Sequence, residues 1–329
     1  MKILLDAMGS DSAPAVEIEG AVQAVEEFGY DVVLVGDEGR IGEELAKYKQ
    51  RPGKITVVHA PERIEMHEPA ALSVRRKRKS SIVVGMELLK RNEADGFVSA
   101  GNTGAVVCAA SLALRLLPGV DRPGIAIVIP TLIGTSVIID VGANIDPKPI
   151  HLLQYGIMAD AYSRYILHKP NPTIGLLNIG EEETKGTEFI KEAHTLLSES
   201  KLNFIGNVEG RDIYAGSADI VLCDGFVGNV ILKVSESVAD TIMKLLRNEI
   251  KSDIISTLGA VLASPAFSEL KKKMDYSEYG GAPLLGVDGG CIISHGSSTP
   301  KAIKNAIKVA AEFKAQGVNN HITEGLENY

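Results

Sequence analysis

The stretch GFVSAGNTGAVVCAASLALRLL, residues 96–117, decides the fold. Gly96–Ser99 is apolar enough for a short buried strand, and the small and apolar residues of Thr103–Leu117 predict a helix. The Ala-Gly-Asn between them is a tight turn that ends in a helix-capping residue. A strand, a turn and a helix in this order are typical of α/β proteins with a largely parallel sheet.

Turns of this composition, rich in Gly, Asn, Asp and Ser, occur seven times, most of them directly after a strand-like segment. They are Asp6–Asp11, Ser99–Gly104, Asp140–Asp146, Asn178–Gly186, Asp224–Asn229, Tyr279–Pro283 and Ser294–Ser298. Ligands of open α/β sheets bind at strand ends, glycine lets the backbone approach a ligand closely, and helix N-termini attract anions. The pattern therefore favours an enzyme with a polar, phosphate-binding cleft.

Strand-like and helix-like segments alternate along most of the chain, from the strand Ile3–Ala7 to the strand Cys291–Ser294 and the helix Pro300–Gln316. No repeat or linker divides the 329 residues, so we expect one α/β domain over 1–329. The alternation predicts a mostly parallel sheet with helices on both faces. The last residues, Glu324–Tyr329, are expected to fray.

One region breaks the alternation and predicts a helical hairpin over about 235–275. Gly228–Lys251 is a long helical pattern, Ile254–Leu262 is a mostly apolar tip, and Phe267–Met274 returns with Lys271, Lys272 and Lys273 on it. An exposed apolar tip beside lysines indicates a partner surface or a membrane interface. A hairpin buried against a second subunit explains the pattern equally well, and both hold if the base dimerises and the tip stays free.

Composition narrows the class of protein. The formal net charge of −8 argues against general affinity for nucleic acid. Cys108, Cys223 and Cys291 have no CxxC spacing and are expected to be free thiols in a reducing cytoplasm. The segment Met1–Asp6 meets an acidic residue too early for the apolar core of a signal peptide. We therefore expect a cytoplasmic protein.

Several catalytic motifs are absent from the sequence. There is no GxSxG, no HExxH, no GxxxxGK[ST] loop and no complete GxGxxG after the first strand, and no histidine pair has metal-ligand spacing. These absences disfavour a serine hydrolase, an NTPase and a Rossmann dehydrogenase. We expect no cofactor and no metal.

Three residues near predicted helix starts are candidates for anion binding. Lys185 precedes a helix and would neutralise a phosphate there, or it is a solvated loop lysine. Asn102 and Thr103 open the helix after Gly96–Ser99, as caps or as anion ligands, and capping is favoured for one of them.

Three further candidates lie at later strand ends. Asp224 and Asn229 flank glycines at the start of the long helix, where aspartate is as compatible with capping as with binding. His295, between a strand and Gly-Ser-Ser, has an intrinsic pKa suited to acid or base catalysis, although a structural role is the commoner one.

The strongest local charge is the run Arg75, Arg76, Lys77, Arg78 and Lys79, in an otherwise acidic protein. A solvated helix face would explain it. Five basic residues in succession favour a docking patch for an acidic partner, because charges at the rim of an interface steer association.

Taken in order, the turns resemble those of the bacterial acyl-carrier-protein:phosphate acyltransferases of phospholipid synthesis. The resemblance covers residue 2 to about residue 316, and its number of segments makes it specific. The matching segments are Asp6–Pro14, Ser73–Lys79, Ser99–Ala105, Asp140–Asp146, Gly175–Gly186, Gly206–Asp212, Ala218–Lys233, Tyr276–Gly286 and His295–Ser297. One departure is Ser10, where the family usually has a second glycine; serine is tolerated only if the backbone there does not need a positive φ.

The resemblance implies a three-layer α/β/α fold like that of isocitrate and isopropylmalate dehydrogenases, and a homodimer. It implies reversible transfer of a long-chain acyl group from acyl carrier protein to inorganic phosphate, which gives acyl phosphate. It further implies a cytoplasmic protein peripherally associated with the membrane, where a glycerol-3-phosphate acyltransferase consumes the product. The acidic carrier protein would suit the basic run. The tip that would dip into the bilayer consists of Ile255, Leu258, Val261 and Leu262.

Because phosphate is the nucleophile in this reaction, no nucleophilic Ser or Cys is required. We predict Lys185, His295 and Asn229 as catalytic residues. The residues predicted to bind substrate or phosphate are Gly9, Asp11, Gly101, Asn102, Thr103, Asn144, Asp146, Asn178, Asp224, Gly225, Gly281 and Ser297. Alternatives are a phosphotransacetylase acting on an acyl-CoA thioester, a decarboxylating dehydrogenase on the same scaffold, and a non-catalytic scaffold that docks carrier protein.

Overall fold

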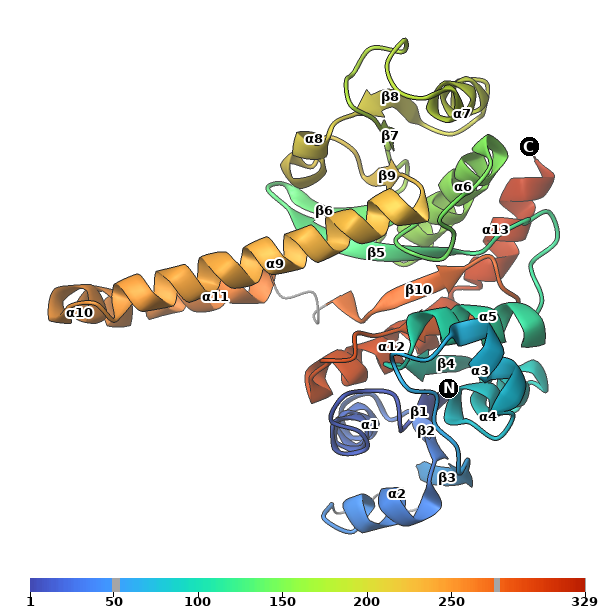
Figure 1. Cartoon of the computed structure of the whole chain (residues 1–329), viewed down its shortest axis with the longest axis vertical. Helices are drawn as coiled ribbons and strands as arrows, with labels where there is room; N and C mark the ends of the chain where they lie inside the picture. The colour runs from blue at the N-terminus through green and yellow to red at the C-terminus, as the bar shows by residue number, and fades with distance from the viewer. Residues whose placement is uncertain (49–53, 275–278, 329) are drawn as a thin grey trace.

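The structure, a computed structural model, describes residues 1–48, 54–274 and 279–328, with side chains for all of these except residues 270–274 (Figure 1). Its strands join in one 11-stranded sheet of order β3-β2-β1-β4-β11-β10-β5-β6-β9-β7-β8. The strands are β1 (Lys2–Asp6), β2 (Asp31–Gly36), β3 (Ile55–His59), β4 (Gly96–Ser99), β5 (Gly124–Thr131), β6 (Gly134–Ile139), β7 (Ile174–Leu177), β8 (Phe204–Val208), β9 (Ile220–Leu222), β10 (Ala282–Leu285) and β11 (Gly290–Ile293).

The sheet has two parallel blocks that run in opposite directions. β3, β2, β1, β4 and β11 are parallel to one another, and so are β6, β9, β7 and β8. Between the blocks, β10 is antiparallel to β11 and β5, and β5 is antiparallel to β6. Sheets twist by about 20–25° per strand, so the second block is rotated by more than a right angle across the steps from β1 to β9. The twist lets strand ends of both blocks approach one side of the molecule.

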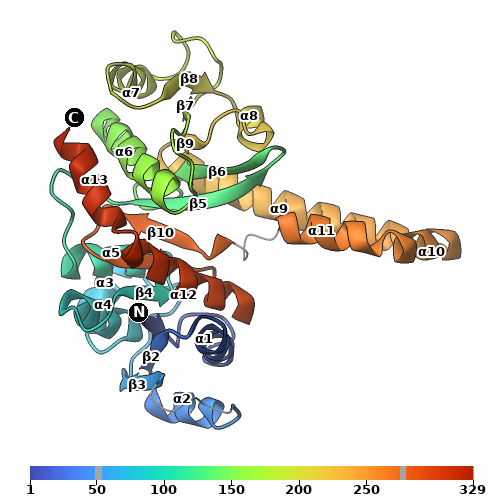
Figure 2. The ribbon, with the colours of Figure 1, turned by 180° about the vertical axis from the view of Figure 1, so that it is seen from behind.

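Helices cover both faces of the sheet (Figures 1 and 2). α1 and α12 pack on one face of the first block and α4 and α5 on the other, while α6 and α13 cover the second block. The helices are α1 (Ala15–Phe28), α2 (Glu38–Leu45), α3 (Ala70–Arg76), α4 (Ser81–Lys90), α5 (Thr103–Ala113), α6 (Pro149–Tyr165), α7 (Glu188–Ser198), α8 (Gly210–Ala215), α9 (Gly225–Ile250), α10 (Ile254–Leu262), α11 (Ser264–Met274), α12 (Pro300–Ala315) and α13 (Val318–Glu327).

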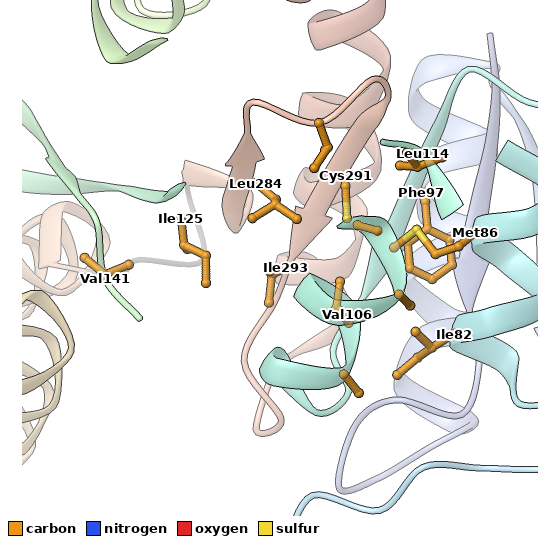
Figure 3. Close-up of a cluster of buried hydrophobic side chains, with 14 of the residues drawn as sticks. Ile82, Met86, Phe97, Val106, Leu114, Ile125, Val141, Leu284, Cys291 and Ile293 are labelled. Carbon is orange, nitrogen blue, oxygen red and sulfur yellow. The ribbon is translucent and has the colours of Figure 1, made fainter. Parts of the chain in front are cut away.

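The alternation of side chains along β1 shows how the layers form. Ile3 and Leu5 enter the apolar cluster under α1 and α12, whereas Leu4 enters the cluster on the opposite face. The second cluster includes Phe97 and Met86 and continues across β11 and β10 to Ile125 of β5 (Figure 3). The predicted α/β fold, with a mostly parallel sheet between helix layers, is confirmed.

α9, α10 and α11 form an arm that projects from the body, on opposite sides of the two views (Figures 1 and 2). Apolar side chains spaced by four residues form an exposed stripe along α9, and all four predicted tip residues on α10 are exposed. The stripe consists of Phe226, Val230, Val234, Val238 and Ile242. Lys271, Lys272 and Lys273 lie outside the residues whose side chains are described. Among the described helices, none is both long and apolar enough to cross a bilayer.

Two features differ from the sequence expectation. Residues 324–327 do not fray but complete α13, where Val318 and Ile322 are buried against α6. The run of basic residues begins inside a short helix, α3, that the sequence pattern did not reveal. The three cysteines are free, as expected, and Cys223 and Cys291 are buried.

Candidate functional site

Three turns from the first block meet at the carboxyl ends of β1, β4 and β11. The backbone N–H of Asp11 donates to Gly296 O at 2.9 Å, which joins the first turn to the last. A β-carbon at Gly9 would lie 2.7 Å from the backbone nitrogen of Gly101, so only glycine allows this approach between the first turn and the 99–104 turn. Gly281 packs against Ile293 of β11, on the same side. The predicted Gly9, Asp11, Gly101 and Gly281 therefore shape one region.

A buried carboxylate holds the first two turns together. Asp6 Oδ2 accepts from Ser99 Oγ at 2.7 Å, and the same hydroxyl accepts from Gly101 N at 3.1 Å. Burial raises the pKa of Asp6, although hydrogen bonds from Ser81, Ser99 and Met8 oppose the rise. Because Asp6 is buried, it stabilises the contact between the two turns and is not exposed to solvent.

Ser10 meets the condition that the sequence sets for it, because its φ is not positive. Its N–H donates to Glu17 Oε1 at 2.7 Å, and its carbonyl accepts from Arg63 Nη2 at 3.2 Å. Glu17, in the first turn of α1, is fully buried, and burial raises its pKa to about 7. The turn is thus held from below by an acid that sequence analysis did not single out.

Asn102 is a structural cap. Its Oδ1 accepts from Ala105 N at 3.0 Å, and its Nδ2 lies 3.0–3.1 Å from the carbonyl oxygens of Glu65, Met66 and Glu68. The amide hydrogens are therefore engaged with the loop above the turn and do not face a ligand. Thr103, the first residue of α5, is exposed, and binding of an anion there stays a prediction.

The 140–146 turn of the second block is organised around another buried carboxylate. Asp140 accepts backbone hydrogen bonds at 2.7–3.1 Å from Ile125, Gly142, Ala143 and Asn144. Burial nevertheless raises the pKa of Asp140. A β-carbon at Gly228 would lie 1.9 Å from Asp140 O, so α9 can begin here only with glycine at that position.

Asn144 and Asp224 fix the junction between this turn and α9. Asn144 O accepts from Gly225 N at 2.9 Å, and its Nδ2 contacts Pro123 O at 2.6 Å and Tyr155 Oη at 2.8 Å. The side-chain amide of Asn144 is therefore engaged within the junction, and its predicted role in binding substrate or phosphate stays a prediction. Asp224 Oδ1 accepts from Phe226 N and Val227 N, which is the capping role.

Lys185 lies in the loop after β7. Its side chain is exposed, and its carbonyl accepts from Asn178 Nδ2 at 3.2 Å. Asn178 Oδ1 accepts from Ile179 N at 2.8 Å. Asn178 thereby shapes the loop that presents Lys185, and the catalytic role of the lysine stays a prediction.

α9 links the two blocks. Lys233 Nζ lies 3.3 Å from His295 Nε2, although these residues follow strands of different blocks. His295 Nδ1 lies 2.7 Å from Ser297 Oγ and accepts from Ser297 N at 3.2 Å, so both ring nitrogens have polar neighbours. A β-carbon at Gly142 would lie 3.8 Å from the side chain of Asn229, one helical turn before Lys233.

Asn229, Lys233, His295 and Ser297 are therefore brought together at the base of α9. Sequence analysis missed Lys233 as a site residue, because it lies on a helix face beyond the turn. Its one signal was its place at the end of a segment that matches the family, Ala218–Lys233.

A pocket of about 550 Å³ opens beside this region. It lies between the 140–147 turn and the starts of α7 and α9, and it includes the predicted Asp146 and Asp224. Its lining consists of Ile145, Asp146, Pro147, Thr187, Phe189, Asp224 and Phe226.

The predicted docking residues are exposed except for Lys77. Its Nζ bonds to Glu68 and to Arg63 O, so Lys77 stabilises the loop below and does not extend into solvent. The exposed members are Arg75, Arg76, Arg78 and Lys79.

The fold places the chain in a known class. It is similar to the phosphotransacetylase of Streptococcus pyogenes, with a TM-score of 0.63, 18% identity and coverage of 94% of this chain and 93% of the other. It is also similar to 4-hydroxythreonine-4-phosphate dehydrogenase of Klebsiella pneumoniae, with a TM-score of 0.56, 13% identity and coverage of 95% and 99%. The class is therefore the α/β fold that phosphotransacylases share with such dehydrogenases, as predicted.

Sequence comparison then gives the family. A family described as "Fatty acid synthesis protein" matches residues 1–321. The chain is 52% identical to the phosphate acyltransferase of Geotalea uraniireducens (strain Rf4) over 330 residues, which cover 100% of this chain and 95% of that protein. It is 52% identical to the phosphate acyltransferase of Dictyoglomus turgidum over 328 residues, with coverage of 99% and 98%. The chain belongs to the phosphate acyltransferase family, which confirms the resemblance seen in the sequence.

Proposed function

We propose that the protein transfers a long-chain fatty acyl group from acyl carrier protein to inorganic phosphate, reversibly, and forms acyl phosphate for phospholipid synthesis. Family membership supports phosphate as the acceptor. The observation that carries the proposal is the meeting of Lys233, Asn229 and His295 at the junction of the two blocks. A cation, an amide and an imidazole in one place suit a phosphate that attacks a thioester.

The reaction balances without a covalent enzyme intermediate. An oxygen of hydrogen phosphate attacks the thioester carbonyl, the carbon–sulfur bond breaks, and the phosphate proton ends on the carrier thiol. The imidazole of His295 accepts the proton from phosphate and returns it to the departing sulfur. Lys233 and Lys185 offset the negative charge of phosphate and of the tetrahedral oxyanion. The side-chain amide of Asn229 donates a hydrogen bond to the phosphate or to the oxyanion.

The surface suits the remaining partners. Acyl carrier protein is acidic, and the exposed Arg75, Arg76, Arg78 and Lys79 give it a complementary patch. Leu72, also exposed on α3, adds an apolar contact beside the patch. We place the carrier protein on α3.

The arm accounts for the proposed homodimer and membrane association. A second copy would cover the apolar stripe of α9 from Val230 to Ile242, and the tip on α10 would enter the headgroup region of the bilayer. Ile255 and Leu262 at that tip are 82% and 85% exposed. A cytoplasmic enzyme bound at the membrane would deliver acyl phosphate to a membrane glycerol-3-phosphate acyltransferase.

Thiol release from palmitoyl carrier protein, with and without inorganic phosphate, tests the function. We expect phosphate-dependent release, with acyl phosphate trapped by hydroxylamine. Lys233→Ala should lower kcat by about 10²-fold or more. Lys244→Ala should not, although Lys244 lies further along α9 and pairs with Asp240 much as Lys233 pairs with Glu236. Release from palmitoyl-CoA alone would favour the phosphotransacetylase alternative, and no release from either donor would refute the proposal.

A further inference from the structure

The pocket between the 140–147 turn and the starts of α7 and α9 has no role in the steps above. Its volume of about 550 Å³ is within the range of small-molecule sites. Four of its lining side chains are apolar, namely Ile145, Pro147, Phe189 and Phe226.

Two of the apolar side chains have little cover from their own chain. Ile145 is 73% exposed and Phe226 is 59% exposed. Large apolar side chains exposed around a pocket mark a surface that a ligand or partner covers. The pocket therefore suits an apolar occupant.

The charged members of the lining, Asp146 and Asp224, disfavour an anionic occupant. The carboxylates of Asp146 and Asp224 both border the pocket, and neither forms an ion pair among the described residues. Two carboxylates repel phosphate or the head group of a free fatty acid. Of the parts of a thioester substrate, the neutral hydrocarbon chain therefore fits this pocket best.

The position of the pocket connects it to the proposed chemistry. Thr187 and Phe189 line it just after Lys185, and Phe226 lines it three residues before Asn229. A chain lying in the pocket thus has its carbonyl end near the residues that would stabilise the oxyanion.

We propose that this pocket binds the acyl chain of the thioester, and that Ile145 and Phe226 set the preferred chain length. The inference depends on the proposed acyl transfer and adds a binding site for the hydrocarbon. Each methylene that the pocket removes from water raises kcat/KM about fourfold, until the pocket is full.

Chain-length series test the assignment with small donors that bypass carrier docking. Butyryl, octanoyl and dodecanoyl thioesters of N-acetylcysteamine are compared in the wild type, Ile145→Trp and a control, Ile133→Trp, whose side chain is 80% exposed on the β5–β6 hairpin outside the pocket. We expect Ile145→Trp to lower kcat/KM for the dodecanoyl donor at least tenfold and to leave the butyryl donor unchanged. An equal effect on all donors, or the same effect in the control, would overturn the proposal.

A binding measurement separates failure of this inference from failure of the proposed function. Dodecanol, which is neutral, should raise the melting temperature of the wild type and of Ile133→Trp but not of Ile145→Trp. Dodecanoate should bind more weakly than dodecanol, and Asp146→Asn should narrow that difference. If dodecanol does not bind the wild type, the proposal is wrong. If Phe226→Ala changes the molecular mass in solution and leaves dodecanol binding unchanged, a second copy of the chain covers this surface, and the proposal is again wrong. If dodecanol binds as expected but no thioester is turned over, the pocket stands and the proposed function falls.

Discussion

Replacing Glu17 by glutamine should stabilise the protein at alkaline pH and leave it unchanged at acidic pH. The carboxyl of Glu17 is fully buried, and its Oε1 accepts from Ser10 N at 2.7 Å. Hydrogen bonds from Ser10 and from the backbone of Glu17 lower the pKa of the carboxyl, but burial outweighs them. Asp6 raises the pKa further, while Arg63 is held at Ser10 O and Arg40 at Ala13 O. The folded protein therefore prefers the protonated acid.

The magnitude follows from the two pKa values. The pKa of Glu17 is about 7 in the folded protein against 4.5 in the unfolded chain, and at 1.36 kcal/mol per pKa unit this corresponds to about 3 kcal/mol. Because the folded pKa is the higher one, the stability is fully present below pH 4.5, falls as the pH rises to about 7, and stays low above it. Glutamine keeps the acceptor for Ser10 N and carries no charge at any pH.

Thermal unfolding at pH 5 and pH 8 measures the effect. An unfolding entropy of about 2.1 cal/mol/K per residue over 329 residues turns about 3 kcal/mol into a Tm rise of about 4 °C at pH 8. The rise should shrink to about 1 °C at pH 5, where the glutamate of the unfolded chain is only partly more ionised than that of the folded protein. Glu26→Gln, at an exposed position of the same helix, should shift Tm by much less at both pH values. A rise of equal size at pH 5 and pH 8, or a Tm loss at pH 8, would refute the reasoning.

Three further outcomes are expected. Gly228→Ala should destabilise by about 3 kcal/mol and abolish activity, because its β-carbon would lie 1.9 Å from Asp140 O; a Tm within 2 °C of the wild type, about 1.4 kcal/mol, would show that α9 yields easily. Charge reversal of Arg76 and Arg78 to glutamate should raise KM for acyl carrier protein about tenfold at low salt and less at high salt, and an unchanged KM would move the dock elsewhere. Leu258→Glu should abolish liposome binding and preserve activity in solution, whereas dissociation of a dimer would favour the buried hairpin.

The architecture was predictable where local pattern decides it. The turns after β1, β4 and β11 and the capping residues Asn102 and Asp224 follow from composition alone, since glycine and short polar side chains have specific backbone uses. The antiparallel direction of β10 could not be predicted from the sequence. A four-residue strand does not show by itself which way it runs, and its pairing is set by β11 and β5, one of which is far away in the chain.

The site was predictable by region and less so by role. The sequence identified the asparagines at strand ends, but it could not show that the Asn144 amide is hydrogen-bonded to Pro123 O and Tyr155 Oη. Sequence analysis did not identify Lys233 as a site residue, because its partner His295 is 62 residues away. The two side chains lie close together only because the sheet twists. Glu17 escaped because a glutamate on a helix is ordinarily exposed.

The way α9 is anchored makes it a lever. Its close contact with the 140–146 turn at Gly228 is a pivot, and at 1.5 Å per residue Lys233 lies about 7.5 Å from that pivot while Ile250 lies about 33 Å from it. A stiff helix that tilts about this point moves its far end about four times as far as it moves Lys233. A displacement of about 4 Å where the arm meets another surface therefore shifts the lysine about 1 Å relative to His295, comparable to the tolerance of a hydrogen bond.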